Sequence, residues 1–327
     1  MPPDLEDLLL SHCEEAEKKP FFYLKCKTDW IYILMSKIRG DSNIKKLFLC
    51  VRSKSFNPQG FSKLLKMDFD EYVNASSNPT SIANVHLALQ TTGSFTSNIN
   101  GGGTINATEL TQVNEGNVEY IKEVVNQFGM DWIVLYNALL LKKSIVVISD
   151  DLTALYEFLS ALPLLVSHRR NEILSQAIRP FVINDAHGIH IEDIMTMGYY
   201  LVGTLDAALP SALSSSYDLV VIYNEKRLTV ANNAAADMKM CSFHKDLSQS
   251  VLSAAQAGLG EDEEESHSGE ELLSMITEKT QMVLKQLQSI AQESETGKVT
   301  AEGIKQKSSN ESLQQWLLRV AISENMV

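Results

Sequence analysis

Cysteine is scarce in this sequence, and the spacings in which it binds zinc or forms a redox pair are missing. The four cysteines stand far apart and no C-x-x-C pair occurs: Cys13, Cys26, Cys50 and Cys241. Neither a structural zinc nor a catalytic dithiol is therefore indicated. Three of the four stand in or near apolar runs, which predicts buried free thiols.

Long apolar runs are missing as well. No stretch reaches the roughly 20 residues that span a bilayer, and the first residues lack the pattern of a secretory signal. We therefore expect a cytoplasmic protein without a transmembrane segment. The glycosylation sequons at Asn74, Asn106 and Asn310 are then chance matches.

Positive charge is in short supply. The 327 residues include 28 Lys and Arg against 41 Asp and Glu, a formal net charge of -13. A surface of this sign opposes the phosphates of nucleic acids and the head groups of anionic lipids. The composition therefore argues against a general nucleic-acid binder and against electrostatic docking on membranes.

The sequence also lacks catalytic motifs: G-x-S-x-G, H-E-x-x-H, G-x-G-x-x-G and the Walker loop do not occur. Gly101–Gly103 lacks a strand before it, a helix directly after it and a Lys-Ser/Thr pair, so it is not a phosphate loop. One local group could suggest a metal site: Asp185, His187, His190, Glu192 and Asp193. Gly188 and the apolar helix that follows favour a turn and a helix cap instead, so we expect neither metal nor cofactor.

The most informative stretch that is present runs from Val118 to Asp151. Apolar residues recur at steps of three and four as far as Leu141, which predicts one continuous helix. Ile145–Ile148 is apolar on both faces and predicts a central strand of a covered, parallel sheet. Ser149, Asp150 and Asp151 then offer N-caps to a second helix.

Strands and helices are predicted on both sides of this stretch: three strands and then two helices before it, and alternating helices and strands after it. The elements before it are strands at Phe21–Cys26, Trp30–Met35 and Lys46–Val51, a helix from Pro58 and a helix over Ser81–Leu89. Residues 91–117 are rich in Thr, Ser, Asn and Gly, which predicts a disordered linker. The elements after it are a helix from Leu152 to Pro163, a strand at Phe181–Ile183, a helix over Ile191–Leu201, a hairpin of Leu219–Tyr223 with Arg227–Val230, and C-terminal helices, the last with a Ser308–Glu311 capping box.

Two groups of charged residues are the physical candidates for a site. Asp150 and Asp151 stand at the turn where an α/β protein would bind phosphate, and their carboxylates would repel it. This argues against a nucleotide enzyme, and simple helix capping is the favoured interpretation of the pair. His168, Arg169 and Arg170 could bind an acidic partner, or could be a solvated cationic helix end.

Four segments together resemble the DENN domain family. They are NQFGMDWIVLYNALLLKKSIVVISDD (126–151), ALPLLVSHRR (161–170), GYYLVGTLD (198–206) and YDLVVIYNEKRLTV (217–230). The resemblance implies an α+β, longin-like N-terminal lobe (1–90), a flexible linker (91–117), a three-layer α/β lobe (118–240) and downstream helices (241–327). The family's first lobe begins with a hairpin of two further strands that this sequence does not show, so a sheet edge would be exposed.

The resemblance also implies a function. Family members are guanine nucleotide exchange factors for Rab GTPases, and they hold the nucleotide-free Rab between the lobes without a general base. It further implies a peripheral protein of late endosomes. Two alternatives stay open: a non-catalytic adaptor that binds a Rab or an endosomal sorting complex, and a GTPase-activating protein, for which Arg39 and Arg52 are the first lobe's arginines. No short motif fixes the exchange residues, so Asp150, Asp151, His168, Arg169 and Arg170 remain the candidate partner-binding residues.

Overall fold

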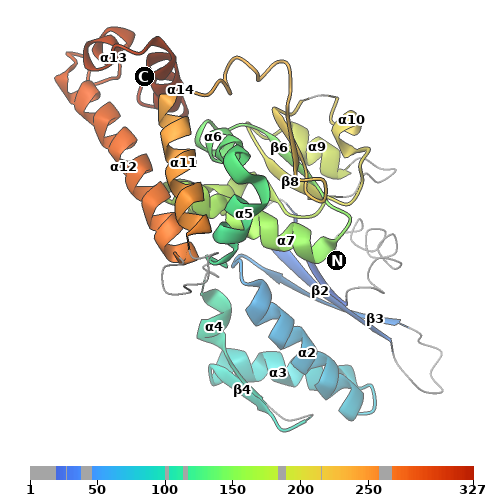
Figure 1. The fold of residues 1–327 in the computed structure, drawn as a ribbon. Helices are drawn as coiled ribbons and strands as arrows, with labels where there is room; N and C mark the ends of the chain where they lie inside the picture. Colours follow the sequence, from blue (N-terminus) through green and yellow to red (C-terminus); the bar gives the residue numbers. More distant parts are fainter. Residues whose placement is uncertain are drawn as a thin grey trace. The chain divides into compact units, whose positions relative to one another are not determined.

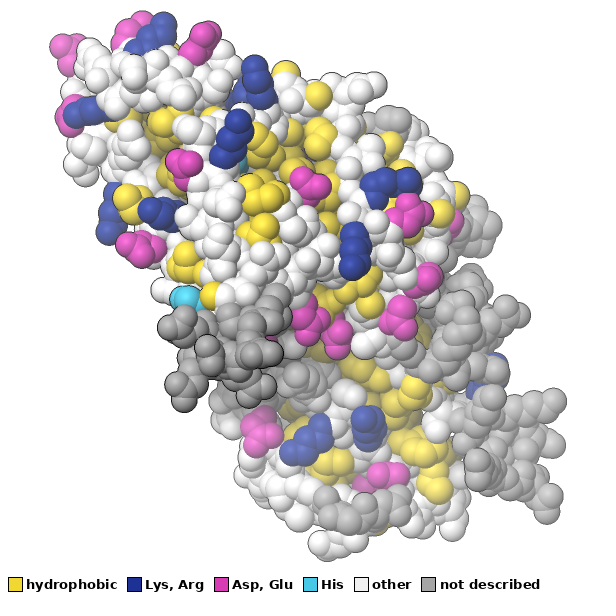
Figure 2. Space-filling model, viewed as in Figure 1, with side chains coloured by type: hydrophobic (Ala, Val, Ile, Leu, Met, Phe, Trp, Pro, Cys, Tyr) yellow, Lys and Arg dark blue, Asp and Glu magenta, His cyan; other side chains and the backbone are white. Residues whose placement is uncertain are grey.

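The computed structural model shows a mixed α/β protein made of two compact units, Met1–Asn114 and Glu115–Val327 (Figure 1). It describes residues 20–26, 28–37, 46–99, 103–112, 117–182, 189–214, 216–257 and 267–327. On the face drawn in Figure 2, acidic and basic side chains are interspersed, with apolar side chains between them. Each unit is described by itself.

The first unit contains the three strands that the sequence predicts. They form an antiparallel sheet in the order β1-β2-β3: β1 (Phe21–Cys26), β2 (Asp29–Lys37) and β3 (Lys46–Ser53). Two predicted helices are also confirmed, α2 (Pro58–Asn74) and α3 (Pro79–Thr91). Each begins with a proline behind an asparagine that caps it, because proline at the first helical position loses no hydrogen bond.

An aromatic layer fixes α2 to the sheet. The Tyr32 ring stacks on Phe61 of α2 at 4.3 Å between centroids, and the Trp30 ring lies 4.5 Å from that of Phe56. The Tyr32 hydroxyl accepts a hydrogen bond from the Asn57 backbone N–H (2.8 Å) and donates one to the Ser55 carbonyl (2.8 Å). The alternation of β2 therefore places the helix start against one face of the sheet.

The prediction of a disordered linker over 91–117 is wrong for most of that segment. It holds a hairpin of β4 (Ser94–Ser97) with β5 (Gly103–Asn106), followed by α4 (Ala107–Thr111). Hydrogen bonds supply what apolar residues do not. The Thr96 and Thr104 hydroxyls bond across the hairpin at 2.9 Å, and Asn57 Nδ2 donates to the Glu109 carbonyl at 2.6 Å. Residues 100–102 and 113–116 lie outside the described ranges.

The second unit is built on a five-stranded sheet in the order β10-β9-β6-β8-β7. Its strands are β6 (Ile145–Ile148), β7 (Ile178–Arg179), β8 (Leu201–Thr204), β9 (Leu219–Ile222) and β10 (Arg227–Val230). β6 pairs in parallel with both neighbours, β8 and β9, which confirms the predicted central strand. β9 and β10 form the predicted antiparallel hairpin.

Two elements of this sheet differ from the prediction. The strand expected at Phe181–Ile183 lies earlier, at β7, and the helix expected as far as Leu201 ends at Met195 as α9 (Ile189–Met195). Leu201 instead opens β8. The deciding residue is Gly203, since a Cβ at this position would overlap the Leu159 side chain and the Pro180 carbonyl. The periodicity of apolar residues in the sequence does not reveal that the backbone at Gly203 comes so close to its neighbours.

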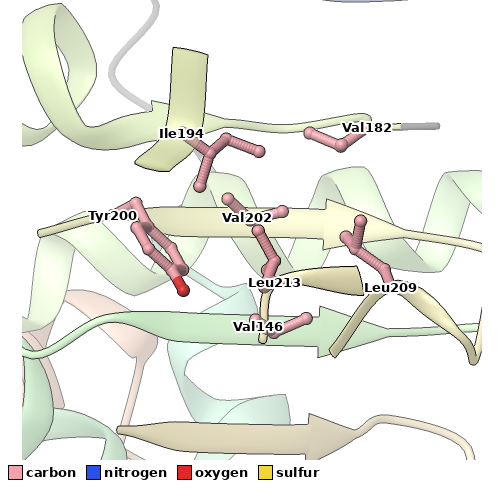
Figure 3. Close-up of a cluster of buried hydrophobic side chains, with 7 residues drawn as sticks. All are labelled: Val146, Val182, Ile194, Tyr200, Val202, Leu209 and Leu213. Atoms are coloured by element: carbon pink, nitrogen blue, oxygen red, sulfur yellow. The ribbon is translucent and has the colours of Figure 1, made fainter. Parts of the chain in front are cut away.

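Helices cover both faces of the sheet. On one face, β-sheet residues Val146 and Val202 pack against Ile194 of α9 and against Leu209 and Leu213 at α10 (Leu209–Ala212), as Figure 3 shows. On the other face, α7 (Leu152–Ala161) packs against β6 and β8. This arrangement agrees with the predicted layered α/β architecture.

The long helix predicted from Val118 to Leu141 is broken. α5 (Tyr120–Phe128) ends at Gly129, whose φ is +55°, and a short 3-10 turn leads into α6 (Trp132–Leu140). Glycine adopts this backbone conformation without steric cost, so the chain can change direction there. The predicted apolar stripe is nevertheless buried: Ile121, Val125, Phe128, Trp132, Leu135 and Leu139.

After α7 the chain continues through the 3-10 segment η2 (Leu162–Arg169), in which Pro163 is the second residue, so the predicted helix end is confirmed. The C-terminal helices belong to the second unit: α11 (Ser242–Gln256), α12 (Gly269–Glu293), α13 (Ala301–Lys307) and α14 (Glu311–Ser323). The predicted Ser308–Glu311 capping box is wrong, since Asn310 caps α14. Of the described cysteines, Cys241 is buried as expected, whereas Cys26 and Cys50 are exposed.

Candidate functional site

Three parallel strands of the second unit end in polar residues at the same edge of the sheet. Ile148 of β6 is in register with Thr204 of β8 and with Ile222 of β9. Two residues further on, these strands lead to Asp150, Asp206 and Asn224. The carboxyl ends of parallel strands are where α/β folds bind their ligands, so this edge is the first place to look for a site.

Asp150 is exposed yet held in place by Asn224. Asn224 Nδ2 donates a hydrogen bond to Asp150 Oδ1, and Asn224 Oδ1 accepts one from the Asp150 backbone N–H at 3.2 Å. The same amide oxygen accepts a hydrogen bond from Ser149 Oγ at 3.2 Å. One side chain therefore ties the end of β6 to the β9–β10 turn and orients a solvent-facing carboxylate.

The turn that carries Asn224 is itself anchored. The Tyr223 and Tyr120 hydroxyls lie 2.5 Å apart, and Gln127 Nε2 donates to the Tyr223 carbonyl at 3.2 Å. Burial raises the pKa of the Tyr120 hydroxyl, and its bond to Tyr223 and the nearby carboxylate of Glu157 raise it further. The Tyr120 hydroxyl therefore stays protonated near neutral pH and can bond to that of Tyr223.

Asp151, in contrast, is used for folding. Its Oδ1 accepts a hydrogen bond from the Ala154 backbone N–H at 2.8 Å, so it is the N-cap of α7. Asp206 likewise accepts a bond from the Ala208 backbone N–H at 2.8 Å while remaining half-exposed. Asp150 differs from these two aspartates, because its hydrogen bonds are to the Asn224 side chain and do not cap a helix or a turn.

The second predicted group, His168 to Arg170, lies at the other end of the α7–η2 segment. Arg169 is only 5% exposed. Its guanidinium donates to the Leu140 carbonyl at the end of α6 and pairs with Glu324 at 3.0 Å. His168 Nε2 also lies 3.0 Å from the Glu324 carboxylate. These contacts join the end of α6 to the end of α14 inside the second unit.

Electrostatics stabilise this junction. Burial by itself would raise the pKa of the Glu324 carboxyl, but the hydrogen bond from His168 and the charge of Arg169 outweigh it and hold the pKa below its usual value. Glu324 is therefore ionised at neutral pH. Arg170 is half-buried at the start of α8 (Arg170–Glu172).

The structure does not bring the two predicted groups together. The ten residues of α7, which rise about 15 Å at the usual helical spacing, lie between them. The candidate site therefore consists of the strand edge around Asp150, whereas His168 and Arg169 form an internal junction.

Other sequence candidates are engaged elsewhere or lie outside the described residues. Asp193 is paired with Arg179 at 2.8 Å, whereas residues 185 and 187 are not described. Within the described ranges, no three His, Cys, Asp or Glu side chains are grouped so that they could hold a metal ion. Arg52 is paired with Asp29, and Arg39 is outside the described residues. None of the helices that the structure describes could span a membrane.

Comparison with known proteins identifies the fold around this edge. A family model described as "stabilization of polarity axis" matches residues 119–232, which run from α5 through β10. Proteins named DENN domain-containing protein 10 are similar over almost the whole chain. The one from Danio rerio is 28% identical over 332 residues (99% of this chain, 90% of the relative). Those from Homo sapiens and Dictyostelium discoideum are 28% and 24% identical over 337 and 349 residues (99% of this chain; 89% and 90% of the relatives).

The chain is thus similar to the DENN domain family over almost its whole length. At the candidate site, the sequence indicated Asp150 as a candidate but not the residues that hold it, Asn224 and Tyr223. It also did not indicate Glu324, the internal partner of His168 and Arg169. The predicted β9–β10 hairpin contained a signal for Asn224, since the turn after β9 had to lie beside the end of a neighbouring strand. No local signal linked residue 324 to residue 169.

Proposed function

We propose that this protein is a guanine nucleotide exchange factor for a Rab GTPase and acts in late endosomal trafficking as a peripheral, cytoplasmic protein. The observation that carries the proposal is its similarity, over 99% of its length, to DENN domain-containing protein 10 from several organisms. The resemblance of its motifs to exchange factors supplies the activity.

The proposed mechanism needs no catalytic base. An exchange factor accelerates nucleotide release when it binds the nucleotide-free GTPase more tightly than the loaded form, because differential affinity shifts the equilibrium between the two states. A chain without a catalytic motif can do this with surface contacts alone. We therefore assign partner contact, not chemistry, to the site.

Asp150 is the residue on which we base the contact. Its carboxylate is exposed and held by Asn224, so it can bind a cationic group with little further loss of conformational entropy. Glu225 in the adjacent turn is also exposed, but it is paired with Arg227 at 3.1 Å, so the negative charge offered to a partner is assigned to Asp150. A basic region of the GTPase is the complementary surface, and screening by salt should slow the association.

The test is nucleotide release. Purified Rabs loaded with fluorescent GDP are mixed with the protein in excess GTP, and release is followed with time. We expect one Rab to be accelerated selectively. Asp150→Lys should reduce that acceleration about tenfold or more, because it places like charges opposite each other. Glu302→Lys is the matched control, since Glu302 is an exposed carboxylate of α13 and the net charge changes equally.

The alternative is a non-catalytic adaptor that binds a Rab or an endosomal sorting complex. The same assay separates the two. Binding of a Rab by pull-down without any acceleration of release would support the adaptor, and absence of both would overturn both functions for the Rabs tested.

A further inference from the structure

The edge strand β3 stands out in the first unit because burial stops abruptly there. In β2, Tyr32 and Ile33 are 0% exposed. Their register partners on β3 are Val51, which is half-buried, and Cys50, which is exposed. Leu47, Phe48 and Leu49 of β3 are also only half-buried. The apolar layers of the sheet thus continue to its edge, where α2 and the neighbouring strand cover them only in part.

The register shows which backbone groups of β3 face outward. Met35 N–H donates to the Pro20 carbonyl at 2.7 Å, so the odd-numbered residues of β2 bond toward β1 and the even-numbered ones toward β3. In antiparallel pairing the odd-numbered residues of β3, which include Leu49 and Val51, then form the backbone hydrogen bonds to β2. The backbone groups of Phe48, Cys50 and Arg52 point away from the sheet. Within the described ranges no strand pairs with this edge.

Such an edge is a template for another strand. β3 has eight residues and no proline, and its centre is apolar. Soluble proteins usually interrupt long apolar edges with charges, proline or bulges, since unpaired edges recruit other chains. We propose that the outer edge of β3 binds an extended, acidic segment of a partner protein as an additional strand.

The charge of the occupant follows from Arg52 and Lys54. Their side chains are 71% and 74% exposed, and both contact one carboxylate, that of Asp29, which is 6% exposed. Among the described residues, these two cations share one buried anion, so this end of the edge carries net positive charge. An incoming strand with a carboxylate opposite these cations gains a cross-strand ion pair, and its apolar side chains extend the two faces of the sheet.

A second copy of this chain fits the edge less well. The outward groups allow two β3 strands to pair along their whole length with Cys50 opposite its counterpart. That register places Lys46 of one copy opposite Lys54 of the other. Like charges directly opposite each other destabilise strand pairing. The acidic peptide is therefore the committed occupant, and self-association is an outcome that the experiment must detect.

The first measurement is amide hydrogen exchange, resolved to single residues, on the full-length protein. The probe is a short peptide in which valine and threonine alternate and a glutamate stands near each end. We expect exchange at Phe48, Cys50 and Arg52 to slow at least tenfold on adding the peptide, because their N–H groups become bonded. Leu49 and Val51, already bonded to β2, serve as internal controls and should change little. Unchanged exchange at all three outward amides with excess peptide would overturn the proposal.

The matched variants are Cys50→Pro and Cys50→Ala. Proline removes only an N–H that points away from β2, so the sheet should persist while the edge can no longer donate at its centre. We expect peptide affinity, measured by fluorescence anisotropy, to fall about tenfold or more in Cys50→Pro and less than twofold in Cys50→Ala. Equal affinities would contradict strand pairing, and this comparison does not depend on the exchange data.

Two further outcomes identify a wrong occupant. A peptide with glutamine in place of glutamate should bind more weakly at low salt, and equal binding would overturn the acidic assignment. A concentration-dependent dimer that Cys50→Pro abolishes would replace the peptide by a second copy. Neither result bears on nucleotide release, so the proposal and the exchange function can fail separately.

Discussion

The two charged groups at the ends of the α7–η2 segment look alike in the sequence and differ in the structure. Asp150 is exposed, and a neighbouring amide orients its carboxylate toward solvent. Arg169 is 5% exposed, and its guanidinium is bonded to a helix carbonyl and to Glu324. A charged pair in a sequence therefore says little about binding until its internal partners are known. Burial separates charges that hold the fold from charges that can hold a partner.

The strongest way to test this contrast is to remove the buried cation. Arg169→Ala should lower the free energy of unfolding by about 3 kcal/mol, because it removes a buried guanidinium and leaves the half-buried Glu324 carboxylate with His168 but without this cation. The Leu140 carbonyl also loses a donor. Urea unfolding measured by circular dichroism gives the value.

A double variant provides the control for this prediction. In Arg169→Ala combined with Glu324→Gln, both members of the ion pair are absent, so the loss should be smaller than the sum of the two single losses. Additive losses would mean that the two side chains do not interact, and the internal junction would then be wrong.

The next prediction concerns pH. The pKa of Glu324 is lowered in the folded protein, so its contribution to stability is fully present above the unfolded pKa of about 4.3 and is lost as pH falls through the folded pKa. The difference in unfolding free energy between wild type and Glu324→Gln should be constant near neutral pH. It should shrink on acidification. A difference that grows below about pH 4 would have the opposite sign and would contradict the assignment.

How far the sequence predicts the fold depends on whether a segment's pattern is local. The central strand Ile145–Ile148 and the stripe of α6 are recognisable because burial on all sides leaves a continuous apolar run. β8 is missed, since the apolar residues of α9 and of Leu201–Thr204 lie close together in the sequence and Gly198 is the one turn signal between them; the close approach at Gly203 is visible only in the structure. The β4–β5 hairpin is missed because hydroxyl and amide bonds hold it together, with Ile105 its buried apolar residue.

The candidate site is less predictable for the same reason. Asp150 could be found, since it follows a recognisable strand. Its partner Asn224 is 74 residues away, and only the register of β6 with β9 brings the two together. The role of Arg169 depends on Glu324, at the far end of the chain. Pattern reasoning identifies charged residues but does not supply the long-range pairing that decides their function.

A smaller effect tests the difference between the two neighbouring aspartates. Asp151→Ala should lower the free energy of unfolding by about 1 kcal/mol, because the Ala154 N–H at the start of α7 loses its acceptor. Asp151→Ser should recover most of this loss, since serine also accepts from the first turn. Equal destabilisation by both would indicate that capping is not what Asp151 contributes.

The smallest effect on stability is expected at Asp150, where the effect on function should be largest. Asp150→Ala removes an exposed carboxylate, so the free energy of unfolding should change by no more than about 0.5 kcal/mol. Exchange, or Rab binding if the protein is an adaptor, should nevertheless weaken. Asn224→Ala leaves the carboxylate but no longer fixes its orientation, so it should weaken the same activity to a lesser degree.

Two outcomes would contradict this prediction. If Asp150→Ala and Asn224→Ala both have the same effect on activity as Glu302→Ala, which removes an exposed carboxylate of α13, the strand edge does not contact the GTPase. If both variants unfold more easily than Asp151→Ala, the Asp150–Asn224 contact belongs with Arg169 among the charges that hold the fold.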